Sequence, residues 1–125
     1  MVNLFILLIC NMIVPLIMTI LGVIIKNHPP KKINGIYGYR TSSSMKNNET
    51  WEFANKLCGI IWKKVGIIMI IVTLVVTVIS LNFSDSVQGI ICAITVSIQT
   101  AVLIVTIFPV EKALNKNFDK DGNRL

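Results

Sequence analysis

The chain has 125 residues, of which 54% are hydrophobic, and its mean hydropathy is +0.73. This composition excludes an ordinary water-soluble domain and is typical of an integral membrane protein. The formal net charge of +6 could suggest nucleic acid as a partner. Direct nucleic-acid binding is not expected, however, because the basic residues flank apolar runs, as residues facing anionic lipid headgroups do.

Three long apolar runs cover residues 2–25, 65–83 and 87–109, and none of them contains Asp, Glu, Lys, Arg or His. Each run is close to the roughly 20 residues that a helix needs to cross a bilayer. In lipid a helix satisfies its own backbone hydrogen bonds. The sequence therefore predicts an all-α integral membrane fold with three transmembrane helices, built as a single domain over residues 1–125.

The first run contains Asn11 and Pro15 on one face. Pro15 removes a backbone donor and is expected to kink the helix. A polar amide in hydrocarbon usually faces another helix rather than lipid. Asn11 is therefore interpreted as a helix-packing contact, and a role in the passage of a ligand is the alternative.

The segment after the first run, residues 26–64, mixes glycine, amide, hydroxyl and aromatic side chains. Gly35 and Gly38 permit tight or left-handed turns, and Arg40 can pair with a phosphate or carboxylate through two parallel hydrogen bonds. The candidate recognition residues are Asn34, Gly38, Tyr39, Arg40, Thr41, Ser44, Asn47, Trp51 and Asn55. The alternative is a structural re-entry loop, in which these side chains hold lipid phosphate, cap helices and anchor the chain.

The second half of this segment predicts an amphipathic helix that lies in the membrane interface, between the first and second spans. Asn47 or Asn48 can cap its start. Its apolar stripe, with lysines off the stripe, consists of Trp51, Ala54, Cys58 and Ile61. Trp51 is expected to anchor this helix in the interface.

The short link 82–86 predicts that the second and third spans form an antiparallel hairpin. The third span carries Thr95 and Gln99, which can share a face with Gln88. Hydrogen bonds between membrane helices contribute only about 0.6 kcal/mol on average, so these residues indicate packing at least as strongly as a ligand pathway. Pro109 is expected to end the third helix and to leave a polar tail, residues 110–125.

The distribution of basic residues predicts the orientation. Residues 26–64 carry eight Lys or Arg and the tail 110–125 carries four, whereas the link 82–86 has only Asp85. Lys and Arg accumulate in cytoplasmic segments. We therefore expect the N-terminus outside, and both the loop 26–64 and the C-terminus in the cytoplasm.

The sequence contains no recognisable catalytic set. No nucleophile–base pair, metal-ligand spacing or glycine-rich phosphate loop is visible, and there is one histidine. We expect a non-enzymatic protein without a metal or other cofactor.

One pattern resembles a known family. Gly38-Tyr39-Arg40-Thr41, followed by Ser44, Asn47, Trp51 and Ala54-Asn55, is similar to the signature of the SdpI family of bacterial membrane proteins. These are the immunity proteins against the sporulation-delaying killing peptide. The likeness extends to the Lys-Lys-Ile-Asn approach and to the C-terminal Glu111-Lys112-Ala113-Leu114. The chain resembles a short, single-module member with three spans.

The resemblance implies a multi-pass protein of the bacterial cytoplasmic membrane that protects its host from a membrane-active peptide toxin. In the best-known system it also implies a signalling role, in which the toxin-engaged protein holds a small transcriptional repressor at the membrane. The expected partners are thus membrane lipids, the peptide toxin and such a repressor. The residues alone leave open a small transporter or channel-like protein, which would have to form as a homo-oligomer because one copy has too few helices.

Overall fold

The computed structural model describes residues 4–125. Four helices follow one another along this part of the chain: α1 (Leu4–Asn27), α2 (Asn48–Ser80), α3 (Asp85–Val105) and α4 (Ile107–Asn117). Three stretches, α1, α2 and α3 with α4, are long and apolar enough to cross a membrane. The predicted all-α fold with three spanning helices is confirmed in length and composition, and residues 2 and 3 of the first predicted span lie outside the described range.

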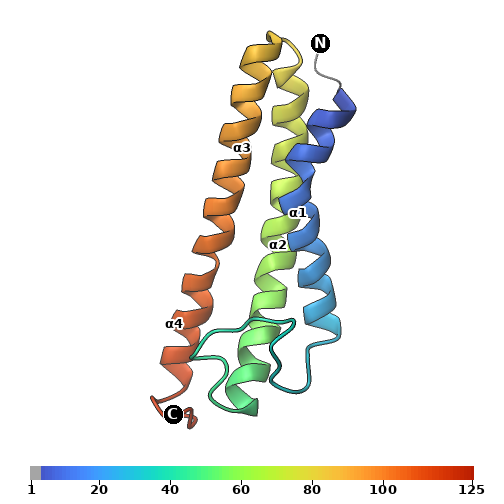
Figure 1. Ribbon diagram of the computed structural model, residues 1–125. Coiled ribbons are helices and arrows are strands. Elements are labelled where there is room, and N and C mark those ends of the chain that lie inside the picture. Colours follow the sequence, from blue (N-terminus) through green and yellow to red (C-terminus); the bar gives the residue numbers. More distant parts are fainter. Residues whose placement is uncertain (1–3) are drawn as a thin grey trace.

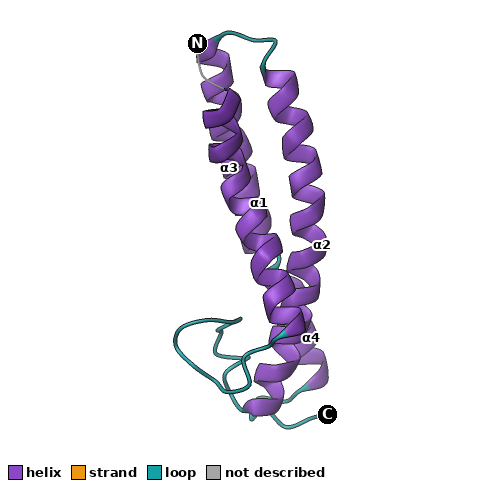
Figure 2. Ribbon diagram, turned by 90° about the vertical axis from the view of Figure 1, so that its right-hand side faces the viewer, coloured by secondary structure: helices purple, strands orange, loops and turns teal. Residues whose placement is uncertain are grey.

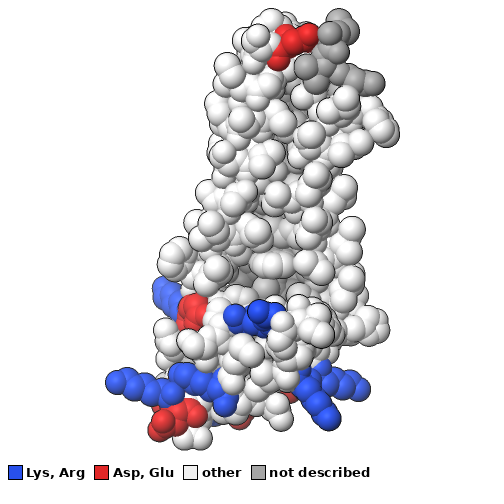
Figure 3. Space-filling view, viewed as in Figure 1, with Lys and Arg blue, Asp and Glu red and all other residues white. Residues whose placement is uncertain are grey.

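The three long helices run side by side in alternating directions (Figure 1 and Figure 2). The short link 81–84 joins α2 to α3 at the end where α1 begins, which confirms the predicted hairpin. The loop 28–47 and the C-terminus lie together at the opposite end, beside α4. On the face shown in Figure 3, Lys and Arg side chains gather at this end, whereas the helical shaft above it is uncharged up to an acidic side chain at its far tip.

The prediction of a separate interfacial helix between the first and second spans is wrong. Residues 48–80 form one continuous helix, α2, and the stripe expected to face lipid lies on its first turns. Trp51, Ala54 and Cys58 are at most 1% exposed, and the last two pack in a core with the loop and α4. An apolar stripe of helical period fits a protein core as well as a membrane surface. No proline interrupts residues 48–80, so the helix continues directly into the span.

Pro109 does not end the third helical stretch, contrary to the prediction. Pro109 lies in the first turn of α4, where a missing N–H is tolerated. The carbonyl that would have accepted this N–H belongs to Val105, and α3 ends at that residue. The predicted polar tail 110–125 therefore begins as a helix with a buried face.

The buried core changes character along the molecule. At the basic end it is apolar and consists of Tyr39, Ala54, Cys58, Val110, Leu114 and Phe118. Within the shaft, several fully covered side chains are polar, namely Asn11, Thr73, Thr77 and Gln99. This division follows from the solvent, because lipid provides no hydrophobic driving force between helices and polar contacts and close packing take its place.

Glycines allow α1 and α2 to approach closely. A Cβ atom at Gly59 would lie 2.6 Å from the backbone nitrogen of Lys26 and 3.0 Å from the carbonyl oxygen of Gly22. Both neighbours are backbone atoms of α1, so they cannot move aside without separating the helices. Small residues at such contacts are the usual means by which membrane helices come together.

We predict that Gly59→Ala lowers the free energy of unfolding in detergent by about 1–3 kcal/mol, because the new methyl group overpacks the crossing. Gly89→Ala is the matched control, since nothing lies within 4 Å of a Cβ atom there. In a helix alanine is favoured over glycine by about 1 kcal/mol, so Gly89→Ala should be neutral or stabilising. Thermal unfolding of both variants checks this, and equal stabilisation would contradict the close crossing.

Candidate functional site

Four of the candidate recognition residues form one group, which we call the signature cluster: Gly38 and the buried Tyr39, Trp51 and Asn55. The Asn55 side chain accepts a hydrogen bond from the backbone N–H of Tyr39 at 2.6 Å and donates to the carbonyl of Trp51 at 2.8 Å. The indole N–H of Trp51 donates to the carbonyl of Pro30 at 2.7 Å. These bonds join α2 to both halves of the loop. The expected role of Trp51 as an interfacial anchor is therefore wrong, because its side chain is 0% exposed.

Gly38 lies against the side chains of Asn55 and Trp51 of α2. Its φ of +112° lies in the left-handed region, as the sequence suggested. A Cβ atom there would also lie 2.6 Å from the Asn55 amide oxygen that holds Tyr39. Both the backbone conformation and the space therefore require glycine.

Thr41, Ser44 and Asn47 order the chain immediately before α2. The backbone N–H of Thr41 donates to the Ser44 hydroxyl, and the backbone N–H of Ser44 donates to the Thr41 hydroxyl. Asn47 is the N-cap of α2 and forms a reciprocal capping box with Thr50, which confirms one of the two predicted caps. Its side-chain N–H also donates to the carbonyl of Gly122 at 2.7 Å, so the start of α2 holds the C-terminal segment.

Asn34 and Arg40 lie outside the signature cluster. The Asn34 side-chain oxygen accepts from the backbone N–H groups of Ile36 and Tyr37, each at 2.9 Å, and so closes a local turn. The exposed Arg40 guanidinium donates to the carbonyl of Gly35. These two side chains shape the loop itself, and the Arg40 side chain is exposed.

Glu111 completes the site, and the sequence reasoning gave it no role. The Tyr39 hydroxyl donates to a Glu111 carboxylate oxygen at 2.9 Å and thereby ties the loop to α4. Burial, and then this hydrogen bond, raise the pKa of Tyr39 well above its ordinary value of 10.0. Two sequence signals pointed to Glu111: it is the only acidic residue in α4, and it belongs to the C-terminal stretch that resembles the SdpI family.

A cavity of about 320 Å³ lies beside the signature cluster, between the loop and the helices. Tyr39, Arg40 and Thr41 line one side, and Trp62, Leu103 and Ile107 line the other. Trp62 is itself held there, because its indole N–H donates to the Thr106 hydroxyl at the junction of α3 and α4. The loop, α2 and the α3–α4 junction thus meet around one space at the basic end of the shaft.

We predict that Tyr39→Phe removes the loss of stability at alkaline pH that deprotonation of the Tyr39 hydroxyl causes. The folded state holds the phenolic proton more tightly than the unfolded chain, so this group stabilises the fold fully below pH 10.0 and loses that contribution as the pH rises further. Tyr39→Phe should unfold about 1–3 kcal/mol more easily near neutral pH, because the hydrogen bond is to a carboxylate. Its stability should also fall less steeply above pH 10.0.

The matched control is Tyr37→Phe, because Tyr37 is exposed and close to Tyr39 in the same loop. This variant should retain both the stability and the alkaline slope of the parent chain. Denaturant titrations in detergent at several pH values measure both quantities. If stability fell as steeply with pH in Tyr39→Phe as in the parent chain, the alkaline loss of stability would come from other groups.

The second candidate site is the membrane polar cluster, formed by Asn11, Thr73, Thr77 and Gln99. The Asn11 side-chain N–H donates to the Thr77 hydroxyl at 3.0 Å. The Gln99 side-chain N–H groups donate to the Thr73 hydroxyl and to the backbone carbonyl of Asn11, each at 2.9 Å. One residue of α1, two of α2 and one of α3 are therefore joined in the shaft.

Pro15 explains why Gln99 reaches the backbone of α1. In a regular helix the N–H of residue 15 would donate to the carbonyl of Asn11, four residues earlier, but proline has no N–H. In lipid no water can replace it. The Gln99 amide supplies the missing donor from another helix. Asn11 and Gln99, both predicted as intramembrane polar residues, thus meet through a backbone group that the prediction had not considered.

Thr95, the third predicted intramembrane residue, is not part of the cluster. Its hydroxyl donates to the carbonyl of Ile91 in its own helix at 2.7 Å. The hydroxyl groups that bond to Gln99 and Asn11 belong instead to Thr73 and Thr77 of α2. Their spacing of one helical turn was the available signal, but it does not say which helix faces them.

We predict that Pro15 and Gln99 are energetically coupled. Gln99→Leu should destabilise the protein, because the Asn11 carbonyl then lacks a donor in hydrocarbon. In a Pro15→Ala background the restored backbone N–H satisfies that carbonyl, so Gln99→Leu should cost about 0.6 kcal/mol less. A double-mutant cycle of unfolding free energies in detergent measures this difference.

Gln88→Leu serves as the control for this cycle. Gln88 is also a buried glutamine of α3, but its amide donates to the carbonyl of Phe83 near the link. The cost of Gln88→Leu should be the same in the parent chain and in the Pro15→Ala background. Equal costs of Gln99→Leu in both backgrounds would show that the Asn11 carbonyl does not depend on Gln99.

These features define a small helical membrane protein, with a polar cluster inside the shaft and a loop fixed to α2 and α4 at its basic end. The sequence profile of the SdpI/YfhL protein family matches residues 31–110, and the chain belongs to this family. The match contains the signature cluster and Gln99, whereas Asn11 precedes it and Glu111 follows it directly.

One curated relative is an uncharacterized protein of Bacillus subtilis (strain 168), YfhL, which is 50% identical over 40 residues. That stretch covers 32% of this chain and 36% of the relative, so the match spans about a third of either protein. No solved structure shows a significant match.

Proposed function

We propose that this chain is a non-enzymatic immunity protein of the bacterial cytoplasmic membrane that protects its host from a membrane-active peptide toxin. Membership of the SdpI/YfhL family is the observation that carries the proposal. The immunity role belongs to the SdpI proteins that the signature residues resemble.

The uncharged polar cluster in the shaft supports a neutral peptide, rather than an ion, as the ligand. Its members are amides and hydroxyls, and the three spans predicted from the sequence contain no acidic or basic residue. A proton or cation pathway normally uses intramembrane carboxylates. Neutral hydrogen-bonding groups suit a ligand that is itself neutral at that depth, such as an apolar peptide segment dissolved in the bilayer.

The contacts at the basic end support a signalling role. Trp62 contacts the junction of α3 and α4, and Tyr39 bonds to Glu111 of α4, so a shift of the spanning helices would reach both the loop and the C-terminal segment. In this proposal the N-terminus faces outside, and the basic end faces the cytoplasm. There it holds a small transcriptional repressor when the toxin is bound.

Expression of the chain in a strain sensitive to the sporulation-delaying killing peptide tests the proposal. Cells that carry the chain should survive a peptide concentration that kills the same strain carrying an empty vector. Equal killing of both strains would overturn protection against this peptide. Solute flux through proteoliposomes without any protection would instead favour the oligomeric transporter.

Within this assay we predict that Arg40→Lys impairs protection nearly as much as Arg40→Ala. The guanidinium donates to the Gly35 carbonyl and still presents a planar set of donors beside the cavity, which an ammonium group cannot reproduce. Lys112→Ala is the matched control, because it removes an exposed positive charge from α4. Protection by Arg40→Lys but not by Arg40→Ala, at equal membrane levels, would show that charge alone suffices.

A further inference from the structure

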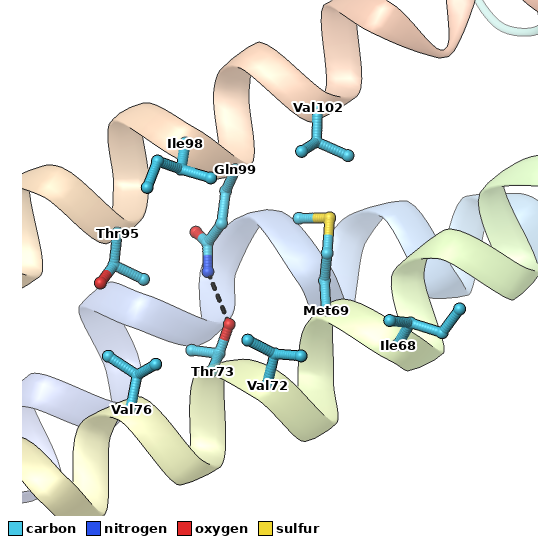
Figure 4. A pocket seen from close by; sticks show the side chains of 9 residues that line it. All are labelled: Ile68, Met69, Val72, Thr73, Val76, Thr95, Ile98, Gln99 and Val102. Carbon is cyan, nitrogen blue, oxygen red and sulfur yellow. Dashed lines mark hydrogen bonds between the residues drawn. The ribbon is translucent and has the colours of Figure 1, made fainter.

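A groove of about 230 Å³ lies between α2 and α3, beside the membrane polar cluster (Figure 4). Its walls are mainly apolar and include Met69, Val72 and Val76 of α2 and Ile98 and Val102 of α3. Two members of the polar cluster, Thr73 and Gln99, also line it. α3 leaves this space open because only Gln88 and Gln99 among its residues are buried.

Gln99 has an unused acceptor at this groove. The side chain is 3% exposed, and both of its N–H groups are donated, to Asn11 and to Thr73. Its amide oxygen, Oε1, is buried and has no hydrogen-bond partner among the described residues. Figure 4 shows this oxygen turned toward the side of the groove where Thr95 and Ile98 lie. A buried carbonyl oxygen without a donor is costly in hydrocarbon, so a donor that enters the groove gains from it.

We propose that this groove binds the indole ring of a tryptophan carried by a membrane-inserted peptide, with the indole N–H donating to Gln99 Oε1. The inference rests on the proposed function for the source of the peptide. It adds the chemical group that is recognised and the residue that recognises it. The two N–H bonds of Gln99 hold its amide plane in place, so the ligand N–H has to reach Oε1 from the side of the groove where Thr95 and Ile98 lie.

The chemistry of the groove selects an indole. No ionisable side chain lines it, so a charged donor would remain unpaired there. A cavity of about 150 Å³ with apolar walls holds benzene, and the larger groove has room for two fused rings. Indole carries a donor and no acceptor, so one bond to Gln99 satisfies all of its polar groups. A lipid acyl chain would fill the walls and leave Oε1 without a donor.

The same chain already pairs indoles with oxygen acceptors at two places. Trp51 donates to the carbonyl of Pro30 in the core of the basic end, and Trp62 donates to the Thr106 hydroxyl beside the shaft. In both cases an apolar ring is packed while its single N–H reaches an oxygen. The groove likewise places an oxygen acceptor, Gln99 Oε1, beside apolar walls that could pack an indole ring.

Binding of two probes to the full chain in lipid nanodiscs tests the proposal. Indole and indene have the same two-ring shape, but indene has no N–H. Equilibrium dialysis against empty nanodiscs separates binding to the protein from partition into lipid. Indole should bind about tenfold more tightly than indene, the factor that corresponds to one hydrogen bond of about 1.4 kcal/mol.

Two variants and a control locate the effect. Gln99→Leu should bring the indole-to-indene ratio close to one, and Val72→Phe, which fills the groove and leaves Gln99 in place, should remove binding of both probes. Ile90→Phe adds an aromatic ring to the exposed face of α3 and should change neither. Equal binding of indole and indene to the parent chain, or no binding of either, would overturn the proposal.

The peptide is tested by competition. A membrane-spanning peptide with one central tryptophan should displace indole from the nanodisc-bound chain, and the same peptide with phenylalanine should not. Equal displacement by the two peptides, or displacement by neither, would overturn recognition of tryptophan. Protection retained in Val72→Phe would refute the groove as the toxin site and leave the immunity function intact. A parent chain that binds indole but does not protect would refute the function alone.

Discussion

The packing of α3 against the other two spanning helices depends on one backbone carbonyl, that of Asn11. Pro15 deprives it of its helical donor, and the bilayer cannot supply another. Gln99 of α3 supplies the donor and uses its second N–H on Thr73 of α2. This geometry fixes the rotation and depth of α3 against the other two helices, although α3 buries little else. It also leaves Gln99 Oε1 without a donor, so the same contact that assembles the shaft creates an acceptor available to a ligand.

The signature cluster has a structural role at the other end of the molecule. Gly38, Trp51 and Asn55 interlock through backbone contacts that leave almost no freedom, so their identities follow from the loop conformation. The residues of the family pattern thus fix the conformation of the loop at the basic end of the shaft. Arg40 differs from its neighbours in sequence because its guanidinium is exposed, and it is therefore the signature residue best placed to contact something outside the chain.

The two sites are linked by short contacts and by continuous helix. α2 carries Thr73 and Thr77 in the shaft and Trp51 and Asn55 at the basic end, without a break between them. Trp62, between these groups, contacts the point where α3 passes into α4. A ligand that moves α3 against α2 would therefore strain the same junction that carries Glu111 and its bond to Tyr39. This arrangement gives the proposed immunity protein a physical route from the spanning shaft to the basic end.

The three spans could be predicted from the amino-acid sequence, and the cap at Asn47 and the left-handed turn at Gly38 were each one of two positions that the sequence offered. Hydrophobic length, capping and glycine conformations are local properties, readable within a few residues. Whether the Trp51 stripe faces protein or lipid could be decided only from the three-dimensional arrangement, because the helical period is the same in both cases. The same holds for Gln99, which meets a carbonyl 88 residues away, and for Tyr39, which meets Glu111 72 residues away. Such pairs depend on the depth and rotation of whole helices, which no local pattern specifies.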